Sequence, residues 1–129
     1  MIQSLTTDFL IRLKNGSRAG RKSITAPGSK YSVALAAIIK KHGFINDFAI
    51  SDDFKKEITI TLGYNDNLPL ISDVKLFSKP GRRVYETAYS LPWGKSKGSL
   101  IIISTSQGLM SQRQAKSKGL GGEIVAEIY

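Results

Sequence analysis

The sequence runs Leu100-Ile101-Ile102-Ile103-Ser104-Thr105-Ser106-Gln107-Gly108 at the point that decides its fold. The run begins with apolar and mostly β-branched residues, which favour a buried central strand at 100–104. The polar residues after it must lie where the strand leaves the core and turns. Their hydroxyls and amide could bond phosphates, sugar hydroxyls or unpaired base edges. The alternative is a hydrophilic loop that only caps itself.

Outward from this strand, the C-terminal half reads mostly as strands. The glycines at 119, 121 and 122 suggest a phosphate loop, but its Lys-Ser/Thr ending and its strand-to-helix context are missing. A tight backbone approach between helix and strand is expected there instead. The other expected elements are strands at 70–79 and 82–86 around a Pro80-Gly81 turn, a basic helix from a Ser111 cap through Lys118 that Gly119 closes, and an alternating strand at 123–129.

The N-terminal half carries two helical patterns and a hairpin. In the first pattern, Leu5, Phe9 and Leu13 share one face at four-residue spacing. The apolar side of the second comprises Val33, Leu35, Ala37, Ile38 and Ile39. The expected elements are a helix from a Thr6 or Thr7 cap to Asn15-Gly16, a strand at 22–25 stopped by Ala26-Pro27-Gly28, a helix from a Ser29 cap to Gly43, and strands at 44–50 and 55–64 that turn at Asp52-Asp53.

The length of 129 residues suits one domain or two small lobes that share an interface. Residues 65–69 form the best candidate linker, because they divide a helix-rich basic half from a half made mostly of strands. We therefore expect an α+β fold, with an N-terminal α-β-α-β-β lobe at 1–64 packed on a C-terminal antiparallel β lobe with a short helix at 70–129.

The composition excludes several kinds of chemistry. The chain has no cysteine and a single histidine, His42, so disulfides, thiolate metal sites, nucleophilic cysteines and histidine clusters are ruled out. We expect no metal, no cofactor and no enzyme activity, since a serine nucleophile would also need a base. No apolar run is long enough to span a bilayer and no signal peptide begins the chain, so a soluble protein in a reducing compartment is expected.

The formal net charge of +9 is distributed unevenly along the chain. Residues 9–46 hold eight basic and no acidic side chains, and residues 87–122 hold five basic and again no acidic ones, whereas four of the ten acidic residues fall within 47–57. Such segregation gives a folded protein a positive face suited to phosphate backbones. The alternative is a merely solvated surface, although solubility does not require the signs to be separated.

Further candidates for nucleic-acid contacts lie near the polar stretch 104–108. Tyr85 follows Arg82 and Arg83, so an aromatic ring and guanidinium groups could stack on bases, although core packing of Tyr85 is equally open. Lys116 belongs to the expected basic helix and is a candidate for a phosphate contact.

Several strings together resemble a known family, in order, spacing and total length. They lie at 8–16, 27–30, 43–45, 79–85, 91–92, 104–110 and 121–123. The combination of Ser104-Thr105-Ser106 with Gly121-Gly122-Glu123 is the most specific part. Over essentially its whole length the chain resembles bacterial-type ribosomal protein eight of the small subunit.

The resemblance implies both a fold and a partner. Its fold is the two-lobed α+β arrangement expected above, and its partner is an irregular helix in the central domain of small-subunit ribosomal RNA, bound chiefly through the C-terminal lobe during assembly. By resemblance, residues 104–108 would contact the distorted RNA core with Tyr85 and Glu123 nearby, while Lys30 and the basic surface of the first helix, including Arg12 and Lys14, would hold RNA backbone.

The chain departs from the family pattern at a few positions. Gln107 stands where Lys or Arg is usual, and Lys14 replaces Arg, which keeps the charge but loses bidentate geometry. Residues 95–99 replace a stretch richer in glycine, and Lys95 and Lys97 could restore positive charge near Gln107. One phosphate contact is therefore expected to have moved.

These inferences predict a structural RNA-binding ribosomal protein, monomeric when free, that touches neighbouring small-subunit proteins. We expect it in the cytoplasmic ribosome, and an organellar ribosome stays open. Two alternatives remain at this point: a repressor that binds a messenger RNA, its own included, with the same surface, and a scaffold whose basic face meets an acidic protein.

Overall fold

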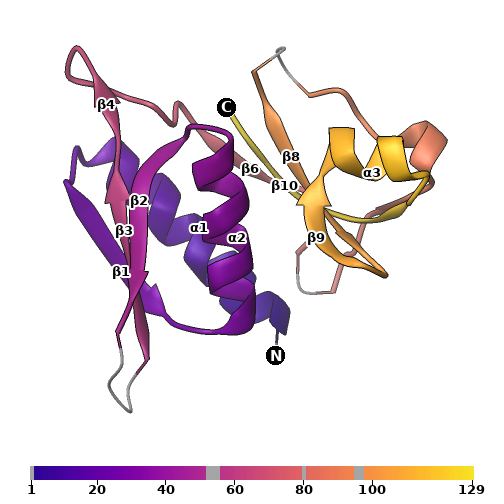
Figure 1. Cartoon of the computed structure of the whole chain (residues 1–129), viewed down its shortest axis with the longest axis horizontal. Coiled ribbons are helices and arrows are strands. Elements are labelled where there is room, and N and C mark those ends of the chain that lie inside the picture. Colours follow the sequence, from indigo (N-terminus) through magenta and orange to yellow (C-terminus); the bar gives the residue numbers. More distant parts are fainter. Residues whose placement is uncertain (1, 52–55, 80, 95–97) are drawn as a thin grey trace. The chain divides into compact units, whose positions relative to one another are not determined.

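The computed structural model describes residues 2–51, 56–79, 81–94 and 98–129, with side chains from Thr6 onward. Its helices and antiparallel sheets confirm the α+β class. The chain divides into two compact units, Met1–Asp73 and Val74–Tyr129, drawn in Figure 1. The expected turn at Asp52-Asp53 and the two lysines at 95 and 97 lie outside the described residues.

The first unit is a three-stranded antiparallel sheet with two helices on one face (Figure 1). Residues alternate along the strands between the buried face, with Ile58, Ile60 and Leu62, and an exposed polar face. Phe9 and Leu13 of the first helix pack in the same core. The elements are α1 (Ile2–Arg18), β1 (Ser23–Pro27), α2 (Lys30–Lys41), β2 (Ile45–Ile50) and β3 (Glu57–Leu62), in the sheet order β1-β3-β2.

Both helices of the first unit differ in detail from the prediction. The first does not end at Asn15-Gly16 but continues to Arg18. A Cβ at position 16 would overlap the Ile24 side chain, so the glycine allows β1 to pack closely against the helix. In α2 the Ser29 cap is confirmed, its hydroxyl accepting from the Ser32 amide at 3.1 Å. Ala37 is exposed, whereas its neighbour Ala36 is buried.

The segment 65–69 holds most of a small ribbon that belongs to the first unit. Strands β4 (Tyr64–Asn65) and β5 (Leu68–Pro69) pair around Asp66 and Asn67, both of which have positive φ. Asp and Asn tolerate this backbone region better than other non-glycine residues, and two such residues suit a tight hairpin. The division between the compact units falls later, after Asp73.

The second unit is an antiparallel sheet with one short helix on one face. Its core joins Ile101, Ile103, Met110 and Ile124 of the strands to Ala115 of the helix. The elements are β6 (Val74–Leu76), β7 (Tyr85–Glu86), the 3-10 helix η1 (Ala88–Ser90), β8 (Leu100–Thr105), β9 (Gly108–Ser111), α3 (Gln112–Lys118) and β10 (Gly122–Ile128), in the sheet order β6-β10-β8-β9 with β7 also on β10.

The prediction that residues 70–79 and 82–86 pair with each other is wrong. Both segments instead pair with β10: β6 pairs at Ala126–Ile128, and β7 pairs at Gly122 and Glu123. Only Lys79 and Arg82 form a bridge between the two segments. The connection is held to β10 by Ser78, whose hydroxyl donates to the Ile124 carbonyl at 2.7 Å and accepts from the Val84 amide at 3.0 Å.

The buried central strand is confirmed, and a strand that was not predicted follows it. The four apolar residues at the start of β8 are fully buried between β10 and β9. Residues 108–111 form β9, so the polar stretch is the tip of a hairpin rather than a free loop. Ser111 then caps α3 by accepting from the Gln114 amide at 3.2 Å, and Gly119 ends it with a φ of 69°, as predicted.

Candidate nucleic-acid interface

One row of side chains crosses the sheet of the second unit. Glu123 lies opposite Tyr85 on one side and opposite Ser104 on the other, and Ser104 in turn lies opposite Leu109. Directly opposed residues in antiparallel strands point to the same face. The sheet therefore brings together three of the expected RNA contacts, Tyr85, Glu123 and Ser104, although they come from three separate parts of the sequence.

The hairpin tip is fixed by Thr105 and Gly108. The Thr105 hydroxyl donates to the Gly108 carbonyl at 2.8 Å and accepts from the Gln107 amide at 3.1 Å. Gly108 has a φ of 109°, a value that side-chain-bearing residues rarely adopt. The Thr105 proton is therefore used inside the turn, and this residue positions its neighbours.

Ser106 and Gln107 are the two residues at the tip that remain available. Both are exposed. Neither side chain forms a hydrogen bond to another of the residues that the structure describes. One hydroxyl and one amide thus point outward from a turn whose backbone is held, so a ligand gains their hydrogen bonds without first having to order the loop.

Two glycines allow β10 to lie close to its neighbours at this row. A Cβ on Gly122 would overlap the carbonyl oxygen of Ser104 and lie 2.9 Å from its carbonyl carbon. A Cβ on Gly121 would lie 2.5 Å from the Glu86 oxygen and 2.8 Å from the Thr87 Cα. The close approach expected from the glycine run is therefore made to the strands β8 and β7, and it sets the spacing of the row.

Glu123 and Tyr85 present opposite chemistries within the row. Glu123 is only 7% exposed, and its Oε2 lies 3.7 Å from Nη1 of Arg83, so its charge is compensated inside the protein. Tyr85 is 65% exposed, which makes its ring a surface for stacking rather than part of the core. Arg82 is also exposed, at the bridge to Lys79.

Lys116 lies on the opposite side of the same sheet. Its helix, α3, covers the face that carries Ile103, and Ser104 follows Ile103 in the strand and so points to the other face. The Lys116 ammonium lies 3.3 Å from the centroid of the Trp93 ring. Lys116 is therefore separate from the row that contains Tyr85, Glu123 and Ser104.

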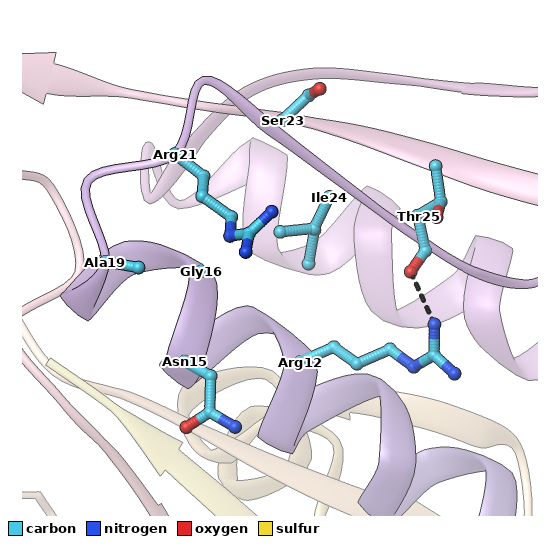
Figure 2. A pocket seen from close by; sticks show the side chains of 8 residues that line it. All are labelled: Arg12, Asn15, Gly16, Ala19, Arg21, Ser23, Ile24 and Thr25. Carbon is cyan, nitrogen blue, oxygen red and sulfur yellow. Dashed lines mark hydrogen bonds between the residues drawn. The ribbon is translucent and has the colours of Figure 1, made fainter.

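In the first unit, the expected backbone-binding cations differ in what they already contact. The Arg12 guanidinium donates from Nε to Asp8 at 3.1 Å. It also donates from Nη1 to the Thr25 carbonyl at 3.0 Å (Figure 2). Lys14 lies 3.5 Å from Asp73, which it shares with Arg18.

Lys30 is exposed and forms no ion pair with the residues that the structure describes. It is therefore the most available cation of the three expected in this unit.

Arg12 also lines a pocket of about 460 Å³ between α1 and β1. Arg21 reaches toward the same space from the loop after α1 (Figure 2). Sequence reasoning placed Arg21 in a basic stretch but did not select it as a site residue, because only the fold brings it beside Arg12.

Comparison with known proteins decides the family. A family model described as Ribosomal protein S8 matches residues 5–129. The chain belongs to this family. Small ribosomal subunit protein uS8 of Spiroplasma kunkelii is 40% identical over 129 residues and covers both chains fully. The uS8 proteins of Vibrio atlanticus (strain LGP32) and Aliivibrio fischeri (strain MJ11) are each 41% identical over 127 residues, 98% of both chains.

No three histidine, aspartate or glutamate side chains gather as a metal site among the residues described. Across the same ranges, no helix is both long and apolar enough to cross a membrane.

Proposed function

We propose that the chain binds an irregular helix in the central domain of small-subunit ribosomal RNA and supports assembly of that subunit and translation. The observation that carries the proposal is the hairpin tip of the second unit, where Ser106 and Gln107 are exposed on a turn fixed by Thr105 and Gly108. A fixed pair of polar side chains suits an RNA helix whose irregular shape displays base edges and 2′-hydroxyls.

In this proposal, the hairpin tip, the row of Tyr85, Glu123 and Ser104, and the neighbouring arginines each have a separate task. Ser104 and Ser106 offer hydroxyls that both donate and accept, and the Gln107 amide does the same through separate atoms. Tyr85 stacks on an unpaired base, and Arg82 and Arg83 flank it with positive charge. Glu123, paired to Arg83 at 3.7 Å, positions that guanidinium.

The first unit contributes electrostatic attraction in this proposal. Lys30, Arg12 and Lys14 face the phosphate backbone, which adds affinity without reading sequence. The protein acts as a monomeric structural component of the cytoplasmic ribosome beside other small-subunit proteins, and catalyses no reaction.

A salt titration tests this proposal. The pure chain is titrated with a central-domain fragment of small-subunit ribosomal RNA and with a random duplex of equal length. We expect tight binding to the fragment, a clear preference over the duplex, and a log affinity that falls linearly with log salt. Equal affinity for both RNAs would overturn the proposal. Preference for a messenger fragment, or binding to an acidic protein only, would favour a repressor or a scaffold instead.

A further inference from the structure

A second candidate site lies on the α3 face of the sheet, away from the row of Tyr85, Glu123 and Ser104. It is a pocket of about 410 Å³, within the range of about 300–1,000 Å³ typical of small-molecule sites. Its walls combine rings, an acid and a base: Phe77, Trp93, Tyr129, Ile101, Glu127 and Lys75.

The polar groups of this pocket come from one cross-strand row. Glu127 of β10 lies opposite Lys75 of β6 and opposite Ile101 of β8, so the three side chains point to the same face. Glu127 is 5% exposed, and its Oε2 would lie 3.2 Å from a Cβ on Gly94, which places the carboxylate beneath the Trp93-Gly94 segment. A buried carboxylate and a lysine side chain thus share one face of the sheet with the apolar Ile101.

Two lysine ammonium groups lie over aromatic rings of this pocket. The Lys116 ammonium lies over one face of the Trp93 ring, 3.3 Å from its centroid. Trp93 nevertheless remains 70% exposed. Lys75 lies 5.0 Å from the Phe77 centroid. Rings with nearby ammonium groups are the usual means of stacking bases and attracting their phosphates.

We propose that this pocket binds an unpaired guanine base of RNA. The base would stack on the open face of Trp93 and accept a hydrogen bond at O6 from Lys75. The Glu127 carboxylate would accept from the adjacent N1–H and N2–H of guanine, a pair of neighbouring donors that adenine, cytosine and uracil lack on their pairing edges. Lys116 would meet the adjoining phosphate.

The local charges favour a nucleotide over a cationic side chain of another protein. An aromatic pocket with a carboxylate can also hold a lysine or arginine. Here, however, the ammonium groups of Lys75 and Lys116 border the rings, against the single carboxylate of Glu127. A further cation would meet this positive charge, whereas a phosphate would be attracted by it.

The inference rests on the proposed function insofar as the guanine comes from RNA, and its test uses short oligonucleotides that the hairpin tip is not expected to select. Labelled UUGUU, UUAUU and UUUUU are titrated with the full chain by fluorescence anisotropy. The chain has a single tryptophan, so quenching of its emission reports directly on Trp93. We expect UUGUU to bind at least about five times more tightly than the other two and to quench the emission.

Variants with matched controls separate the roles of the carboxylate and the ring. Glu127→Gln should bring UUGUU to the affinity of UUAUU, whereas Glu86→Gln, the same charge change at an exposed position, should not. Trp93→Ala should weaken UUGUU about ten-fold, whereas Tyr89→Ala, at a ring that is 98% exposed and outside the pocket, should leave it unchanged. If Glu127→Gln does not fold, the comparison of Trp93→Ala with Tyr89→Ala still tests whether the base binds in this pocket.

Several results would overturn the inference. Equal affinity for the three oligonucleotides would show charge attraction alone. Binding of GMP as tight as that of UUGUU would indicate a free-nucleotide site, and quenching only by N-acetyl-lysine amide would indicate a site for a protein side chain. Binding of the ribosomal fragment is measured in parallel. If the chain does not bind the fragment but still prefers UUGUU, only the proposed function is refuted. If it binds the fragment but shows no preference for UUGUU, only the guanine site is refuted.

Discussion

The hairpin tip of the second unit and the basic surface of the first unit contrast in what their polar groups already contact. At the tip, the Thr105 hydroxyl is used within the turn so that Ser106 and Gln107 remain available. On the first unit, Arg12 and Lys14 contact Asp8 and Asp73 in the free protein.

The contrast shows that internal bonding has opposite consequences at the two places. At the tip it holds the backbone and leaves the outward groups free, which favours selective recognition. On the first unit it occupies the charged groups themselves, so an RNA must compete with the carboxylates for them. Charge supplied there is expected to add affinity that depends on salt, with little selectivity.

The largest effect should come from Gly122→Ala, which forces β10 away from β8 beneath the hairpin. A methyl group there would overlap the Ser104 carbonyl, so we expect the free energy of unfolding to fall by about 3 kcal/mol in a urea titration. Gly98→Ala is the control, because the space around that glycine is open and its φ is not positive. It should change stability by no more than about 0.5 kcal/mol. Equal stability of the two variants would show that the close approach is unimportant.

A pair of substitutions at the tip should separate recognition from positioning. Ser106→Ala should weaken binding of the central-domain RNA fragment by about 1–3 kcal/mol with the unfolding free energy unchanged. Thr105→Val should lower the unfolding free energy by about 1 kcal/mol, because both bonds of its hydroxyl are lost. Calorimetric titration and urea unfolding measure the two quantities. If Ser106→Ala binds like the parent, its hydroxyl contacts no RNA.

A smaller effect is expected on the first unit, where Lys30 and Lys14 differ in their partners. Lys30→Ala should weaken fragment and random duplex equally and reduce the slope of log affinity against log salt by about 1. Lys14→Ala should change the slope less, because Asp73 already faces that ammonium at 3.5 Å. Equal slopes for the two variants would contradict the idea that internal ion pairs reduce the contribution of this surface.

The smallest effect concerns the pKa of Asp47, which another lysine of the first unit keeps low. The Lys40 ammonium donates to Asp47 at 3.0 Å, and this bond, with the Phe48 amide and the charge of Lys40, lowers the pKa of Asp47. A lowered folded-state pKa contributes stability above the unfolded-state value and loses it as the pH falls through the folded one.

We expect Lys40→Met to raise the pKa of Asp47 toward its ordinary value in an NMR titration of the carboxyl carbon. Lys41→Met, one residue away, serves as the control and should leave it unchanged. A pKa of Asp47 that is insensitive to Lys40→Met would mean that the pair does not persist in solution.

Features set by neighbouring residues were predictable from the sequence. The Ser29 and Ser111 caps follow from hydroxyls placed just before helical patterns, and both form the expected bonds. The buried strand at the start of residues 100–108 follows from its composition. Family resemblance added the grouping of Tyr85, Glu123 and Ser104, which composition could not supply because these residues are far apart in the chain.

Features set by distant partners were not predictable. The arms around Pro80-Gly81 pair with β10 instead of with each other, and nothing local marks β10 as their partner. Gly16 looked like a helix end, but it serves the packing of Ile24 across the loop. The pocket at Trp93 joins residues from four separate segments, so sequence spacing gave no sign of it.

The role of β10 as the common partner of β6, β7 and β8 has a consequence for how a nascent chain folds. The sheet of the first unit has all its strands once residue 62 has been made, whereas that of the second waits for residues 122–128. During synthesis, the first sheet can therefore form before the second. The surface proposed to select RNA would then be the last part to take shape, so that binding begins only when the whole chain has folded.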